Sequence, residues 1–175
     1  DTVLAPLDVH RTTVVLFDDL GVAGQFHHFF IIDRELVTQT IEALPPVFAR
    51  DEMALIRDRS VRLMLVQNPT SFQLNLDKFK TTPHPLMIMA GRDIHDPSWL
   101  WTVDFSKLDF VDVVSGFNAH ELALRLHYAG VHVHRVEPKI DEANEHFALL
   151  SGSEPTIVFS ADAMRRTRRY LGLAK

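Results

Sequence analysis

From Val61 onward, short apolar runs alternate with stretches in which apolar residues recur every three or four positions. The apolar runs cover residues 61–66, 86–90, 111–114, 131–136 and 156–159. Runs of this length are typical of strands buried on both faces, whereas the three-to-four spacing is typical of helices that pack on a sheet. The alternation therefore predicts an α/β fold, with a mainly parallel, Rossmann-like sheet and helices on both faces.

Four helical stripes separate or follow these strands. Their members are Phe72, Leu76 and Phe79; Ala119, Leu122, Ala123, Leu126 and Ala129; Ile140, Ala143, Phe147 and Leu150; and Met164, Thr167 and Leu171. Gly130 is placed to end the second helix, because glycine favours the position after a helix C-terminus.

The first 45 residues are less regular. Residues 13–17 predict one strand, ended by a turn-like cluster at 18–21. Asp33 is expected to cap a helix that reaches about Leu44, with an apolar face, and Pro45-Pro46 to stop it. We therefore predict one regular α/β domain over residues 46–175, preceded by a less regular segment over residues 1–45.

Composition excludes several functional classes. The net charge is −5, which argues against nucleic-acid binding, and no apolar run approaches the length of a membrane span. Cysteine is absent, so the chain carries no disulfide, thiol nucleophile or thiolate zinc site. No signal peptide opens the sequence, and a cytoplasmic location is the simplest expectation.

The loop at residues 91–101 carries the highest density of reactive side chains. It contains Asp93, His95, Asp96 and both tryptophans, and it directly follows the predicted strand 86–90. Functional sites in open α/β sheets lie at the carboxyl ends of strands, so this loop is the first candidate for a functional site. Asp96 before Pro97 also predicts the capped start of a short helix, which does not exclude a function.

Three further loops are expected at the same edge of the sheet. They are Asn68-Pro69-Thr70-Ser71, Ser115-Gly116 and Ser160-Ala161-Asp162. For Asn68-Pro69 a strand-ending turn is favoured over a ligand contact, and for Ser115-Gly116 a tight strand-to-helix turn is favoured.

Residues 93–101, Asp-Ile-His-Asp-Pro-Ser-Trp-Leu-Trp, are followed by Val103-Asp104-Phe105. Together they resemble the signature Asp-Gly-x-Asp-x-Ser-Trp-x-(Trp/Tyr)-Asp-x-Asp-Phe of the C-terminal domain of MurT, a Mur-ligase relative and subunit of lipid II isoglutaminyl synthase. Residues 46–52 resemble the linker of that family, and residues 121–126 its Glu-Leu-x-x-Arg-Leu helix. Residues 24–30 resemble, loosely, the end of the Mur-ligase central domain, which implies that residues 1–45 are a remnant or linker of that domain. The main resemblance covers about residues 46–172.

The resemblance implies a function in a complex. MurT docks a glutaminase, GatD, whose cysteine and histidine lack an orienting carboxylate, and the residue that matches the supplied aspartate is Asp96. The ammonia released from glutamine amidates the D-glutamate of the lipid II stem peptide. Asp93 matches a second, structural aspartate, and Trp99 and Trp101 are expected to be packing or interface anchors. His95, Ser98, Asn68, Ser115 and Gly116 complete the set of candidate supporting or interface residues.

The chain also departs from the family. Ile94 stands where the signature has Gly, and Thr102 where it has Asp. The phosphate loop Gly-x-x-Gly-Lys-Thr and the cysteine zinc ribbon of the MurT central domain are missing. We therefore expect no cofactor on this chain, with ATP and Mg²⁺ held by a Mur-ligase central domain elsewhere. The chain is then an excised domain or a reduced homologue, without a complete active site of its own.

Two other functions remain open. One is a catalytically silent docking module, suggested by Ser71 and Ala161-Asp162 in place of family residues. The other is a stand-alone small-molecule binder or hydrolase that uses Asp93, His95 and Asp96.

Two further groups of side chains could bind a metal ion or a phosphate. His132 and His134 alternate on one strand face and His95 is expected at a nearby edge, but ordinary histidines are favoured over a metal site because no third ligand has the expected spacing. The arginines at positions 165, 166, 168 and 169 are interpreted as a solvated helix face rather than a phosphate site.

Overall fold

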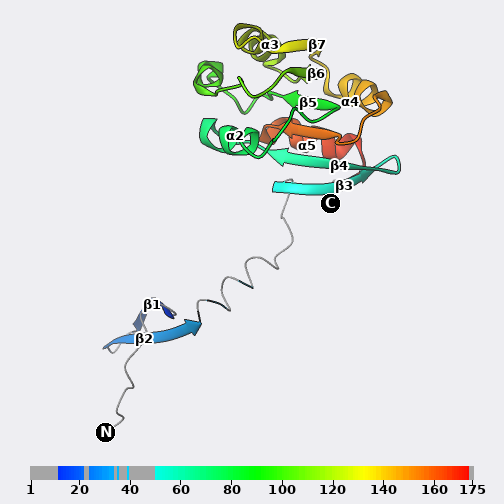
Figure 1. Ribbon diagram of the computed structural model, residues 1–175. Helices are drawn as coiled ribbons and strands as arrows, with labels where there is room; N and C mark the ends of the chain where they lie inside the picture. Colours follow the sequence, from blue (N-terminus) through cyan, green and yellow to red (C-terminus); the bar gives the residue numbers. More distant parts are fainter. Residues whose placement is uncertain (1–11, 22–23, 34, 36–38, 40–49, 174–175) are drawn as a thin grey trace. The chain divides into compact units, whose positions relative to one another are not determined.

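The computed structural model describes residues 12–21, 24–33, 35, 39 and 50–173 (Figure 1). The chain divides into two compact units, Asp1–Pro45 and Pro46–Lys175. Each is described by itself.

The described part of the first unit contains an antiparallel hairpin. Strand β1 (Thr12–Gly21) pairs with β2 (Gly24–Asp33), and Gly21 lies opposite Gly24. The prediction of a turn at residues 18–21 is wrong, because these residues continue β1, where pairing with β2 satisfies their backbone groups and outweighs a local turn preference. Asp33 is the last residue of β2, and the predicted helix that follows it lies mostly outside the described residues.

The second unit is built on a six-stranded sheet. Its strands are β3 (Arg50–Ile56), β4 (Arg59–Leu65), β5 (Leu86–Met89), β6 (Phe110–Ser115), β7 (His132–Glu137) and β8 (Thr156–Phe159). The order is β3-β4-β8-β5-β6-β7; only β3 and β4 are antiparallel, and the other neighbours are parallel. The mainly parallel sheet predicted from the sequence is confirmed.

Helices cover both faces of this sheet (Figure 1). They are α2 (Pro69–Leu76), the 3-10 helix η1 (Pro97–Thr102), α3 (Ala119–Tyr128), α4 (Ile140–Leu149) and α5 (Ala161–Tyr170). Phe72 and Leu122 belong to the core under α2, η1 and α3, whereas Phe147 and Ala163 belong to the opposite core under α4 and α5. Every helix among the described residues is too short or too polar to span a lipid bilayer.

The topology places four loops at one edge. From β5 the chain passes to β6 and β7 on one side, and α4 then carries it back to β8 on the other side of β5. The strand order thus reverses between β5 and β8, and ligands of open α/β sheets bind at the carboxyl ends of strands at such a point.

Strand β3 was not predicted from the sequence. Residues 50–52, interpreted as part of a linker, belong to β3, which joins β4 through a two-residue turn at Arg57 and Asp58. Both turn residues have positive φ, 46° and 63°, as the tight hairpin turn requires. Arg-Asp lacks the glycine that usually marks such turns, so the local sequence gives no hairpin signal.

An ion-pair network links this hairpin to the segment that follows α2. Asp51 accepts hydrogen bonds from the Arg62 guanidinium and from Lys78 Nζ, the latter at 3.2 Å. The hydrogen bond from Arg62 lowers the pKa of Asp51 below its ordinary 3.8, against the opposing effect of burial, and Lys78 lowers it further.

We expect Asp51→Asn to lower the free energy of unfolding by about 1 kcal/mol at pH 7. Because the folded-state pKa is depressed, the carboxylate's contribution is present above 3.8 and is lost as the pH falls through the folded value. Urea unfolding at pH 7 and at about pH 2.5 measures this. A deficit of the same size at both pH values would contradict it.

Candidate functional site

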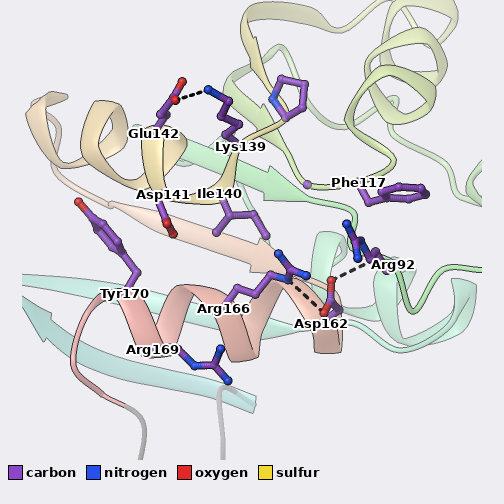
Figure 2. Close-up of a pocket in the computed structure, with 12 residues that line it drawn as sticks. Arg92, Phe117, Lys139, Ile140, Asp141, Glu142, Asp162, Arg166, Arg169 and Tyr170 are labelled. Carbon is purple, nitrogen blue, oxygen red and sulfur yellow. Dashed lines mark hydrogen bonds and ion pairs between the residues drawn. The ribbon is translucent and has the colours of Figure 1, made fainter.

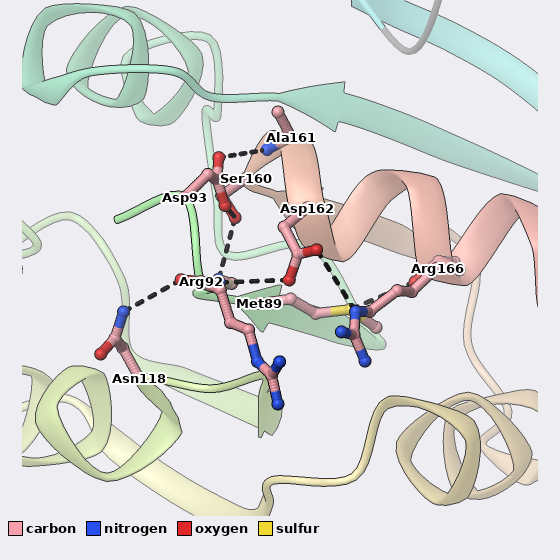
Figure 3. Close-up of polar contacts among 10 residues, drawn as sticks. Met89, Arg92, Asp93, Asn118, Ser160, Ala161, Asp162 and Arg166 are labelled. Atoms are coloured by element: carbon pink, nitrogen blue, oxygen red, sulfur yellow. Dashed lines mark hydrogen bonds and ion pairs between the residues drawn. The ribbon is translucent and has the colours of Figure 1, made fainter. Parts of the chain in front are cut away.

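The loop after β5 is fixed to the start of α5. Gly91 N donates to Ser160 Oγ at 2.8 Å, and Ser160 Oγ in turn donates to Asp93 Oδ1 at 2.6 Å (Figure 3). Asp93 Oδ2 accepts from Ala161 N at 2.8 Å, which places a carboxylate at the N-terminus of a helix, where negative charge is favourable. Both Asp93 oxygens are therefore engaged in holding the loop.

A second anchor comes from the start of α3. Asn118 is 5% exposed, and its Nδ2 donates to the carbonyl oxygens of Gly91 and Ile94, each at 2.9 Å. Sequence reasoning missed Asn118, whose only local signal is an amide residue just before a helix. Ile94, which replaces the family glycine, is buried and is not among the described residues with positive φ. The loop therefore forms without that glycine.

Asp96 lies on the exposed side of this loop. It is the N-cap of η1, with Pro97 at the first helical position, and its Oδ1 accepts from Ser98 N at 2.9 Å. The predicted cap is confirmed. Hydrogen bonds from the Ser98 side chain and then its backbone lower the pKa of Asp96, so the group is an anion at neutral pH. His95 and Ser98 are also exposed.

The two tryptophans differ in environment. Trp99 is half-buried and packs edge-on against Phe72, with ring centroids 6.3 Å apart. Trp101 is 48% exposed, contacts the ring of Tyr128 at 5.5 Å, and lies under the Arg125 guanidinium at 5.6 Å. Trp99 is thus a packing residue, whereas Trp101 presents an ordered aromatic surface to solvent.

The other predicted residues are turn residues. Asn68 and Ser71 form a reciprocal cap at the start of α2, which is a strand-ending turn. Within residues 50–173, Asn68 makes no hydrogen bond to the β5 loop. Ser115 is fully buried, and its hydroxyl has no hydrogen-bond partner in the described part of the chain. Gly116 has φ +99° and forms the predicted tight turn between β6 and α3.

A cavity of about 710 Å³ lies beside the anchored loop, between α5 and the first turn of α4 (Figure 2). Arg92 reaches over the Phe117 ring at 5.3 Å, and Arg166 pairs with Asp162 at 3.3 Å. Lys139 pairs with Glu142 at 2.6 Å on the opposite wall. Sequence reasoning missed Arg92 and Phe117, since neither belongs to a motif. Most of the cavity's charges neutralise one another.

The structure also places the histidines and arginines that could bind a metal ion or a phosphate. In the part of the chain that is described, no group of three or more His, Asp or Glu side chains is placed to hold a metal ion. His95 follows the carboxyl end of β5 whereas His132 begins the parallel strand β7, so the expectation that His95 lies at an edge near His132 is wrong. The solvated-face interpretation fails for Arg168, which is partly buried and pairs with Glu52 at 2.7 Å.

Comparison with known proteins decides the family. The MurT ligase C-terminal family matches residues 65–160, more than half of the chain. The match includes three of the four loops of the candidate edge and ends at Ser160, the first residue of the fourth. This chain belongs to the MurT ligase C-terminal family. Over 111 residues it is 27% identical to the MurT subunit of lipid II isoglutaminyl synthase (glutamine-hydrolyzing) from Streptococcus pneumoniae (strain ATCC BAA-255 / R6). That match covers 58% of this chain and 25% of the relative, so the chain spans about a quarter of the relative's length.

A solved structure supports the fold of this MurT C-terminal domain. A pseudomurein peptide ligase type C from Methanothermus fervidus is similar with a TM-score of 0.56 and 13% identity. The similarity covers 82% of this chain and 32% of that ligase. The domain therefore has the α/β fold of a peptide-ligase domain.

Proposed function

We propose that this MurT C-terminal domain docks a GatD-like glutaminase and supplies Asp96 to its Cys-His site. The complex then amidates the D-glutamate of the lipid II stem peptide. ATP and Mg²⁺ belong, in this proposal, to a Mur-ligase central domain, because this sequence has no phosphate loop. The family match and the name of the pneumococcal relative support the assignment.

The observation that carries the proposal is the position of Asp96. Its carboxylate is exposed at the carboxyl edge of the sheet, ionised at neutral pH, and oriented by Ser98 at the start of a short helix. A carboxylate that must reach a histidine of another protein requires these three properties.

The chemistry explains why the residue must be an anion. A carboxylate bonded to an imidazole fixes its tautomer, so that the other ring nitrogen can take the proton of the thiol. The same negative charge stabilises the imidazolium that results. Asparagine would keep the shape but lose the charge.

The geometry weighs against a stand-alone hydrolase. Asp93 is committed to Ser160 and Ala161, so it is not available as a general base beside Asp96. A silent docking module differs from our proposal only in its effect on the partner. The discriminating measurement is therefore glutamine turnover.

We expect the full chain, added to the GatD-like glutaminase of the same organism, to bind it and to raise its rate of glutamate release. Calorimetry measures binding, and a coupled glutamate assay measures turnover. Binding without a change in turnover would support the silent module. Hydrolysis by the chain alone would support a stand-alone enzyme, and neither binding nor stimulation would overturn the proposal.

A further inference from the structure

A cluster of histidines surrounds a buried carboxylate on β6, in a part of the sheet that the proposed function does not use. Asp112 is 4% exposed. Its Oδ1 lies 3.1 Å from His134 Nδ1 on β7, and its Oδ2 lies 3.2 Å from His84 Nδ1 and 2.7 Å from Leu86 N. Because three groups from two other segments hold Asp112, its position is fixed.

These bonds set the tautomer of His134. A carboxylate only accepts hydrogen bonds, so Nδ1 of His134 is the donor and its Nε2 keeps the lone pair. The Phe110 ring stacks on the His134 ring with an interplanar angle of 6° and centroids 5.6 Å apart. The Phe110 ring thus fixes the plane of the imidazole, and the bond to Asp112 fixes its Nδ1 atom. A bond from Nδ1 to a carboxylate is the arrangement commonly found in histidines that bind metals.

A second imidazole lies beside the first. His132 is two residues earlier on the edge strand β7, so both side chains leave the same face of the sheet. Both are exposed, and their ring centroids are 4.7 Å apart. Two imidazoles bonded to one ion at about 2.0–2.1 Å, with an angle between a right angle and the tetrahedral value, have centroids about 4.5–5.2 Å apart. The observed spacing falls in this range.

We propose that His132 and His134 form a surface site for a divalent transition-metal ion of the Zn²⁺, Ni²⁺ or Cu²⁺ class, with Asp112 as a positioning residue. Neutral imidazole favours these ions over Mg²⁺ and Ca²⁺, which prefer oxygen ligands. The described residues offer no third side chain, so water completes the coordination. The proposal is independent of the glutaminase function.

The test is a ZnCl₂ titration of the full chain by calorimetry. We expect His132→Gln and His134→Gln each to remove one bound Zn²⁺ per chain, or to weaken that binding at least tenfold. His120→Gln, at an exposed position on α3, is the matched control and should bind as the unmodified chain does. Because every variant retains the other histidines, background binding cancels in the comparison. Equal Zn²⁺ binding by all four proteins would overturn the proposal.

Asp112→Asn tests the positioning role. Loss of the carboxylate should weaken Zn²⁺ binding about 10- to 100-fold, as for other partners of metal-bound histidines. It should also shift the His134 tautomer, which nitrogen-15 NMR of the imidazole reports without metal. Circular dichroism checks that the variant is folded. If it is not folded, the two histidine variants still test the metal site. An unchanged tautomer and affinity in a folded variant would exclude the role.

Discussion

Replacing Asp96 by Asn is expected to lower glutamine hydrolysis by the complex about 10³- to 10⁴-fold while the two proteins still bind. The amide keeps the size of the side chain, so the docking surface is preserved. It removes the charge that, in the proposed function, fixes the partner's imidazole and stabilises its protonated form. Steady-state glutamate release measures the loss, and calorimetry measures the retained affinity.

Asp104→Asn is the matched control for this change. Asp104 is also exposed and accepts a hydrogen bond at 2.9 Å from a serine N–H two residues later, as Asp96 does. Both carboxyl groups have a lowered pKa caused by hydrogen bonds from that serine. We expect Asp104→Asn to leave turnover unchanged. If full activity persisted in Asp96→Asn, the role of Asp96 would be refuted.

The largest expected effect on stability is that of Gly116→Ala, roughly 2–4 kcal/mol in the free energy of unfolding. Gly116 has φ +99°, where an L-residue is strained. A Cβ there would also meet the backbone of Ala90, with the carbonyl carbon only 2.8 Å away. Because Ala90 is hydrogen-bonded to Ser115 and Asn118, its backbone cannot move aside easily. Urea unfolding measures the loss.

Gly130→Ala separates the two causes. Gly130 also has a positive φ, +78°, but a Cβ added there has no atom within 4 Å. This variant therefore carries only the conformational cost, about 1 kcal/mol. Equal losses at the two glycines would show that the close approach to Ala90 contributes nothing.

Periodicity predicted most of the second unit. Strand β8 was located to the residue, and the stripes of α3 and α4 correspond to their buried faces. These elements are buried on one or both sides, so their apolar pattern can be recognised in the local sequence. The exposed position of Asp96 also agrees with the motif, although its catalytic role stays a prediction.

The missed features depend on partners that are distant in sequence. β3 exists as a strand because it pairs with β4 and because Arg168, more than a hundred residues later, binds Glu52. Asn118 acts on carbonyl groups of the β5 loop, 24 and 27 residues earlier. Arg92 meets Phe117 and Asp162 only after the sheet has formed. None of these contacts has a local signature.

Some residues anchor the loop after β5, and others form its exposed surface. Asp93 and Asn118 hold it through Ser160, a helix amide and main-chain carbonyls, whereas His95, Asp96 and Ser98 contribute no buried anchor. The exposed positions can consequently mutate without collapse of the scaffold beneath them. Substitutions at these exposed positions can therefore change or abolish protein binding at this edge while the domain continues to fold.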